Sequence, residues 1–127
     1  MLDPEVRRVL DGTPLAHLAT VQPDGAPHTV PLWVATRGEQ IVFLTGPHAR
    51  KVRNLRHDPR VALSIAPADS PWRPVVVRGH VTAWLDGDEG WAVVDEMARK
   101  YTGNAYPRDE ERIVAVIEPD RQTVGIG

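Results

Sequence analysis

The stretch LATVQPDGAPHTVPLWVA, residues 18–35, holds two apolar segments on either side of a turn. Residues 15–21 alternate as a strand does, residues 28–35 form a second strand pattern, and the Asp-Gly pair between them is typical of a hairpin. Because Pro31 has no amide N–H to donate to a sheet, the second strand is expected at a sheet edge or with a bulge. The stretch therefore predicts a β-hairpin in an antiparallel sheet.

The rest of the chain continues this pattern. Three helices are expected: a short one from Asp3-Pro4 to Gly12, a basic one ended by Asp58-Pro59, and one over residues 87–102. The segment TRGEQ (36–40) reads as a turn, and the further strands are expected at 41–45, 60–66, 75–85 (bent at Gly79), 112–119 and, as an end strand, 123–127. This order predicts a mainly β (α+β) fold, a barrel of about six antiparallel strands with peripheral helices.

Composition limits the class of protein. The chain has 127 residues, 42% hydrophobic and 25% charged, which fits one globular domain over residues 1–127. There are no cysteines, so disulfides and thiolate chemistry are excluded. No signal peptide is visible, and no apolar run approaches the roughly 20 residues that span a bilayer. We therefore expect a cytoplasmic protein without a membrane partner.

The segment from His48 to Arg60 is unusually basic. It carries five Arg or Lys residues against one Asp, a net charge of +4, in a chain whose formal net charge is -2. Such a helix can be solvent-exposed, with the aliphatic parts of its Arg side chains covering the core. However, Thr45 and Gly46 end an apolar strand directly before it, and Arg50 and Lys51 fall in its first turn. A strand-to-helix junction of this kind presents free N–H groups that suit an anion.

One phosphate fits this arrangement better than nucleic acid does. A nucleic-acid backbone needs an extended basic track, and the chain has one Phe, two Tyr and a pI of about 6.2. No nucleic-acid partner is therefore expected.

Catalytic machinery supplied by the protein is not visible. None of the five histidines pairs with another at a spacing of three or four residues, so no metal site is predicted. There is no G-x-S-x-G elbow, Walker motif or G-x-G-x-x-G. The pairs Asp95-Glu96 and Glu110-Glu111 are expected on the exposed surface. Trp33 and Trp72 could each wall a flat aromatic ligand or serve as core or dimer contacts. These features indicate a binding protein or an enzyme whose chemistry belongs to a phosphate-bearing cofactor.

Three stretches together resemble a known family. LATVQPDGAPHTVPLWVA (18–35), IVFLT (41–45) and HARKVRNLRHDPRVALSI (48–65) are similar to the pyridoxamine 5'-phosphate oxidase-like split β-barrel family, of the FMN-binding split-barrel type. The likeness is greatest to its actinobacterial branch that uses the deazaflavin coenzyme F420, and it covers nearly the whole chain.

The resemblance implies a homodimer with the cofactor at the subunit interface. Lys51 and Arg50 would hold the cofactor phosphate near Thr45 and Gly46. The family helix often has a basic residue one place before Ala49, where this chain has His48. The remaining residues that the resemblance places at the cofactor ring or the substrate cavity are Thr29, Val30, Pro31, Leu32, Trp33 and Trp72, with Arg73 beside the last.

The family also implies the chemistry. Reduced F420 would transfer a hydride to a small unsaturated or quinone-like substrate, and no residue need act as a catalytic acid. Two alternatives remain open. One is an FMN-binding enzyme like pyridoxamine phosphate oxidase, for which the chain is short and lacks a long basic C-terminal segment. The other is a non-enzymatic cofactor-binding protein.

Overall fold

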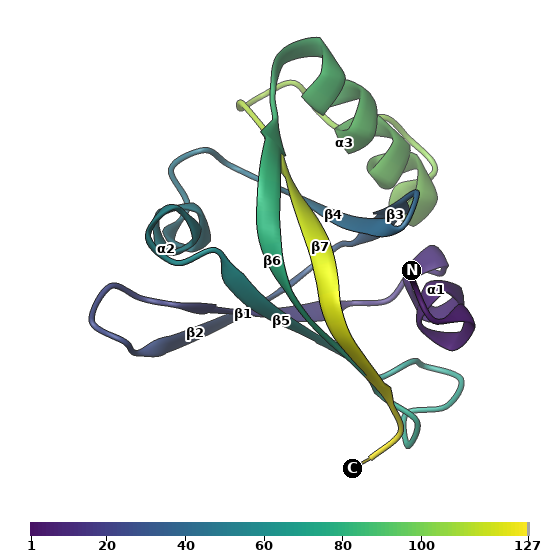
Figure 1. Ribbon diagram of the computed structural model, residues 1–127. Coiled ribbons are helices and arrows are strands. Elements are labelled where there is room, and N and C mark those ends of the chain that lie inside the picture. The colour runs from purple at the N-terminus through teal and green to yellow at the C-terminus, as the bar shows by residue number, and fades with distance from the viewer. Residues whose placement is uncertain (127) are drawn as a thin grey trace.

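The computed structural model describes residues 1–126 and holds one curved sheet with three helices around it (Figure 1). The elements in chain order are α1 (Pro4–Asp11), β1 (Ala16–Val21), β2 (Pro27–Leu32), β3 (Ala35–Arg37), β4 (Gln40–Thr45), α2 (Arg50–His57), β5 (Arg60–Ile65), β6 (Val75–Leu85), α3 (Gly87–Thr102) and β7 (Ile113–Val124).

The sheet has seven strands in the order β2-β1-β5-β6-β7-β4-β3, and every neighbouring pair is antiparallel. Because β2 and β3 form the two ends of this order, the barrel is split between them. The predicted hairpin is confirmed as β1 and β2, and Pro31 lies on the edge strand β2, opposite His17. The mainly β split barrel with peripheral helices is confirmed.

Three details differ from the sequence prediction. The strand expected over 28–35 ends at Leu32, and the chain then crosses to β3, which includes part of the segment expected to turn. The strands expected at 112–119 and 123–127 are one strand, β7, because its pairing with β6 continues past Pro119 to Val124. Residue 127, the last of the expected end strand, lies outside the described residues.

The bend expected at Gly79 has a structural cause. The register of β6 and β7 shifts between Arg78 and Gly79. A Cβ atom at Gly79 would lie 2.4 Å from the carbonyl oxygen of Glu118, so only glycine allows the two backbones to approach this closely. The irregularity lets two long strands coil around the barrel.

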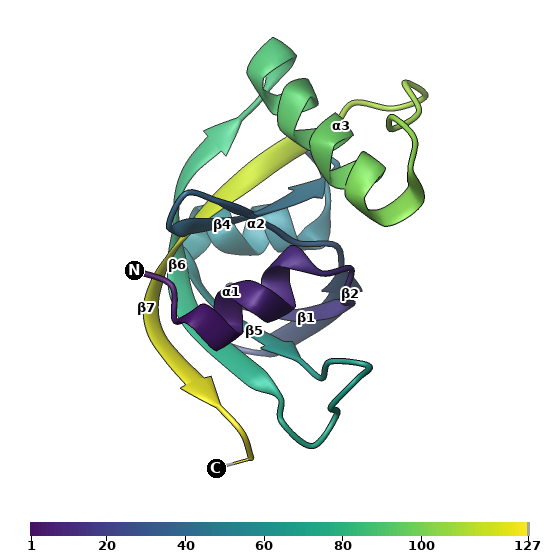
Figure 2. The ribbon, with the colours of Figure 1, turned by 90° about the vertical axis from the view of Figure 1, so that its right-hand side faces the viewer.

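Two apolar clusters hold the fold together. The first fills the barrel and includes Phe43, Leu63 and Ile117, with α1 packed against it. The second lies between α3 and the strands β4 and β7, where Val94 and Met97 are fully buried. In Figure 2, α1 faces the viewer with α3 above it and the loop of residues 66–74 below it. The loop that joins the end of β4 to the start of α2 lies next to the segment that follows α3, since both line one cavity.

Candidate functional site

The N-terminus of α2 has two amide N–H groups without a hydrogen bond. The N-cap residue, Ala49, has no side chain that can accept a hydrogen bond, and no acidic residue lies in the first turn. Within residues 1–126, the amides of Arg50 and Lys51 form no hydrogen bond, whereas those of Val52 and Arg53 donate to the carbonyl oxygen of Ala49. Unpaired N–H groups at the positive end of a helix dipole attract anions. The first-turn position predicted for both basic residues is confirmed.

Two predicted or expected residues precede this N-terminus in the chain, Thr45 at the end of β4 and His48 in the loop between β4 and α2. Thr45 is buried at the end of β4, and its hydroxyl donates to the carbonyl oxygen of Gly46 at 3.4 Å. This distance is long for an O–H···O bond, so the hydroxyl is available to a better acceptor. His48 is exposed and lines a cavity of about 350 Å³. The other residues that line this cavity are Gly46, Pro47, Ala49 and residues 110–112.

Arg112, at the entry to β7, is a basic residue of this region that the sequence did not reveal. Its Nη1 atom lies 3.3 Å from where a Cβ atom at Gly46 would be. Lys51 is half-buried; loss of water around it lowers the pKa of its ammonium group, and the positive charge of Arg112 lowers that pKa further. Two cations from distant parts of the chain are therefore close enough to influence each other's charge, one in the first turn of α2 and one beside the loop that precedes it. The only hint in the sequence is an arginine that directly follows an acidic run and directly precedes a strand.

A second cavity, of about 230 Å³, lies where the chain crosses from β2 to β3. It is lined by Leu15, Pro31, Leu32, Trp33, Leu44 and Tyr106. Trp33 stacks on Tyr101 with ring centroids 4.9 Å apart and planes 8° apart, and Tyr106 meets Trp33 edge-on at 6.3 Å. Such a wall suits a flat, apolar or aromatic group. Leu44 in this cavity and Gly46 in the first are two residues apart, so the two cavities adjoin along the end of β4.

The predicted residues of β2 point to two sides of the strand. Val30 and Leu32 are half-buried and pack against the barrel core, whereas Thr29 and Pro31 are exposed. Trp33 follows the strand and belongs to the aromatic wall. Because β2 is an edge strand, its outer backbone groups have no neighbouring strand.

Trp72 does not join the other predicted residues within one chain. Its side chain is 66% exposed, and it lies in the loop between β5 and β6 with Arg73. Figure 1 shows this loop at the lower right, on the side opposite α2. A contribution from Trp72 would therefore have to come from a second copy of the chain.

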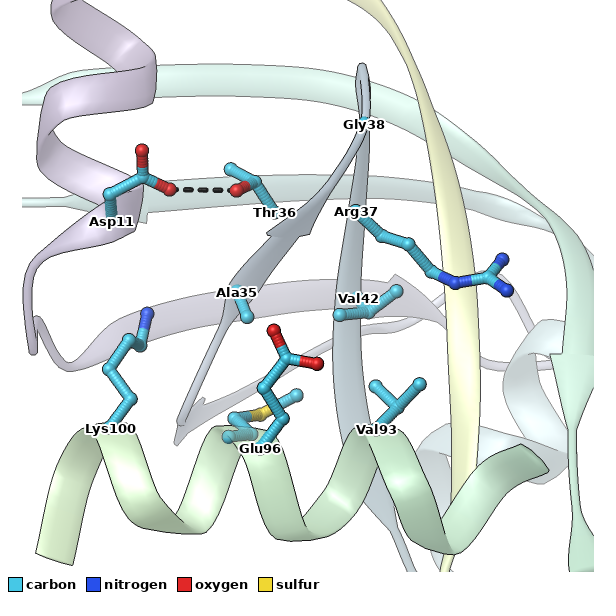
Figure 3. Close-up of a pocket in the computed structure, with 10 residues that line it drawn as sticks. Asp11, Ala35, Thr36, Arg37, Gly38, Val42, Val93, Glu96 and Lys100 are labelled. Carbon is cyan, nitrogen blue, oxygen red and sulfur yellow. Dashed lines mark hydrogen bonds between the residues drawn. The ribbon is translucent and has the colours of Figure 1, made fainter. Parts of the chain in front are cut away.

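Another cavity, of about 420 Å³, lies between α1, β3 and α3 (Figure 3). Its polar groups serve the packing of these elements. Lys100 Nζ donates to the carbonyl oxygens of Leu10 at 2.8 Å and Val34 at 2.7 Å, and the Thr36 hydroxyl donates to Asp11 at 2.7 Å. None of the predicted cofactor residues lines it.

Asp95 corrects an expectation from the sequence. Its carboxylate is partly buried, not exposed, and it accepts hydrogen bonds from the amide of Tyr106 at 3.0 Å and from Arg108 at 2.7 Å. The side-chain hydrogen bond from Arg108 is the main cause that lowers the pKa of Asp95 to about 2. Glu110 is exposed as expected and pairs with Arg112 at 3.2 Å.

Within residues 1–126, no three His, Cys, Asp or Glu residues gather so as to hold a metal ion. In the same range, no helix has both the length and the apolarity required to cross a membrane.

The described residues thus form a split barrel with an uncapped helix N-terminus and an aromatic-lined cavity. The family model described as pyridoxamine 5'-phosphate oxidase matches residues 2–124, and the chain belongs to this family. No curated protein matches the sequence.

Solved structures of similar proteins agree with this assignment. An F420 reductase is 30% identical, with a TM-score of 0.85 over 96% of this chain and 98% of that one. A conserved hypothetical protein from Mycobacterium tuberculosis is 25% identical, with a TM-score of 0.81 over 98% and 84% of the two chains. HutZ, a heme storage protein from Vibrio cholerae, is 17% identical with a TM-score of 0.69 over 98% and 94%, and shares the fold. The fold is thus one used by oxidoreductases of flavin or deazaflavin type, and also by a protein that stores heme.

Proposed function

We propose that this protein is an F420-dependent oxidoreductase that reduces a small unsaturated or quinone-like substrate. The observation that carries the proposal is the uncapped N-terminus of α2, with Lys51 beside it, in a chain 30% identical to an F420 reductase along nearly its whole length. F420 and FMN both carry a phosphate that a ribityl chain links to a flat ring system. The free N–H groups and the aromatic cavity fit these two parts.

One set of residues would bind the cofactor phosphate, and a second set would contact the ring system. The amides and side chains of Arg50 and Lys51, with Gly46 and the Thr45 hydroxyl, would hold the phosphate. The edge strand β2 would run along the ring through the backbone of residues 29–32. Pro31 is compatible with this role, since β2 is an edge strand and a proline is tolerated there. Trp33 would close one wall of the cavity.

When bound, reduced F420 supplies the hydride. The chain's own contribution is to fix the ring relative to the substrate and to exclude water with Leu32, Trp33 and Leu44. No side chain is assigned as a catalytic acid or base. We further propose that the site is completed in a homodimer, with Trp72 of a second copy covering the cavity, since that side chain is exposed in the single chain.

A parallel titration tests this proposal. The purified protein is titrated with F420 and with FMN, and ligand fluorescence is followed. Preferential binding of F420, followed by protein-dependent reoxidation of reduced F420 in the presence of a quinone, is the expected result. Preference for FMN would transfer the proposal to a flavin enzyme, and binding of F420 without turnover of any acceptor would indicate a cofactor carrier.

A further inference from the structure

The segment between α3 and β7, residues 103–112, is fixed to α3 by one carboxylate. Asp95 accepts the amide N–H of Tyr106 at 3.0 Å and two guanidinium N–H groups of Arg108, at 2.9 and 2.7 Å. Arg108 also lies over the ring of Trp91, 3.9 Å from its centroid. A bidentate pair of this kind fixes orientation as well as distance. The segment therefore has one defined position relative to the barrel.

From this position the segment contributes to both adjoining cavities. Tyr106 lines the aromatic cavity, and Arg112 lines the cavity in front of α2. The two side chains are joined, because Arg112 Nε donates to the Tyr106 hydroxyl at 3.2 Å. The guanidinium of Arg112 also donates to the carbonyl oxygen of Glu111 at 3.0 Å and forms an ion pair with the carboxylate of Glu110 at 3.2 Å.

These contacts orient Arg112 without using all of its hydrogen-bonding capacity. A guanidinium has five N–H groups, and the three contacts occupy three of them. Glu110 is 72% exposed, so its charge is well solvated and neutralises Arg112 only weakly. Gly46 lets the guanidinium lie close to the loop that leads into α2, since a methyl group at this position would be only 3.3 Å from Nη1.

We propose that Arg112 is a second cationic ligand of the cofactor phosphate, facing the first turn of α2, and that Tyr106 positions it. This inference rests on the proposed function. The phosphate has up to two negative charges as the monoester of FMN and one as the diester of F420, and Lys51 with Arg112 would neutralise this charge in a partly desolvated place. Glu110 then competes with the phosphate for Arg112. Residues 103–112 would thereby contribute both a ligand of the phosphate, Arg112, and a wall of the aromatic cavity, Tyr106.

The test compares variants by their affinity for two forms of one ligand. The ligands are whichever of F420 or FMN the wild type binds and the same ring system without its phosphate, riboflavin in the case of FMN. Arg112→Gln is expected to weaken binding of the phosphorylated form by roughly tenfold to a hundredfold, the range for a lost charge-assisted hydrogen bond. Binding of the phosphate-free form should not change.

Arg121→Gln is the matched control, because Arg121 is an exposed arginine of β7, the strand that follows Arg112, and lines neither cavity. Tyr106→Phe should show a smaller loss in the same direction, and Glu110→Gln should tighten binding about twofold. An unchanged affinity in Arg112→Gln, or an equal loss for both ligand forms, would overturn the inference and leave the proposed function standing. If the wild type binds neither cofactor, the proposed function fails and this inference with it.

Discussion

Helices α1 and α2 both have eight residues, yet their N-termini are built in opposite ways. In α1 the Asp3 carboxylate accepts the amide N–H of Glu5 at 2.9 Å, Pro4 needs no acceptor, and Glu5 places a negative charge in the first turn. In α2 the cap is Ala49, and the first turn carries Arg50 and Lys51. The first helix caps its own N-terminus, whereas the second leaves the N–H groups of Arg50 and Lys51 without an acceptor among the described residues. Under the proposed function, those two N–H groups of α2 bind the cofactor phosphate, and the N-terminus of α1 has no part in binding.

The largest expected effect concerns the cation beside α2. Lys51→Ala should weaken cofactor binding by about 1–3 kcal/mol, because a charge-assisted hydrogen bond to the phosphate is lost. Arg53→Gln is the control, since it removes one charge from an exposed position on the same helix. Equal affinities of Lys51→Ala and wild type in a fluorescence titration would remove Lys51 from the site.

Giving α2 the cap that α1 has should change stability and binding in opposite directions. The backbone of Ala49 is already extended, with φ -64° and ψ 154°, so Asp fits there. Ala49→Asp should raise the free energy of unfolding by about 0.5–1 kcal/mol and weaken cofactor binding about tenfold, because the new carboxylate occupies the free N–H groups and repels phosphate. Ala49→Ser separates the two causes, since it caps without a charge. A variant that is stabilised but binds as well as wild type would contradict a phosphate at this N-terminus.

The reverse change at α1 should affect stability alone. Asp3→Ala removes the cap and should lower the free energy of unfolding by about 1 kcal/mol, measured by urea denaturation. Cofactor affinity should stay at the wild-type value, because α1 lies on another side of the barrel (Figure 2). A parallel loss of affinity would mean that the two helices are coupled.

A smaller effect is expected from pH, through the carboxylate that fixes residues 103–112. The pKa of Asp95 is about 2 in the folded protein against an ordinary value of 3.8, so the folded state binds this proton more weakly than the unfolded state does. Its contribution to stability is therefore complete above pH 3.8 and is lost as the pH falls toward 2. Asp95→Asn should flatten this part of the pH profile of thermal unfolding. An identical profile in the variant would show that the Arg108 pair does not stabilise the fold.

The sequence predicted most reliably those elements whose structure depends on residues close together in the chain. The hairpin followed from local turn chemistry, and the basic first turn of α2 followed from the order of Gly46, Ala49 and Lys51. Gly79 was identified as a bend, although the reason, the approach of the Glu118 backbone, lies on another strand.

The parts that the sequence did not reveal depend on pairing between distant segments. β3 is three residues long and forms because β4 pairs with it, and β7 stays continuous through Pro119 because β6 shifts its register. The sequence predicts an exposed Asp95, because nothing in its local pattern indicates that Arg108 pairs with it in the folded protein. Arg112 is some sixty residues from Lys51 in the chain, so only the folded barrel brings it to the start of α2.

The most direct measurement is a crystal structure of the wild-type protein with its cofactor bound. We expect the phosphate within hydrogen-bonding distance of the Arg50 and Lys51 amide groups, with the ring system against β2 and Trp33. A cofactor whose phosphate lies elsewhere on the barrel, with the α2 N-terminus still open to solvent, would contradict the central claim.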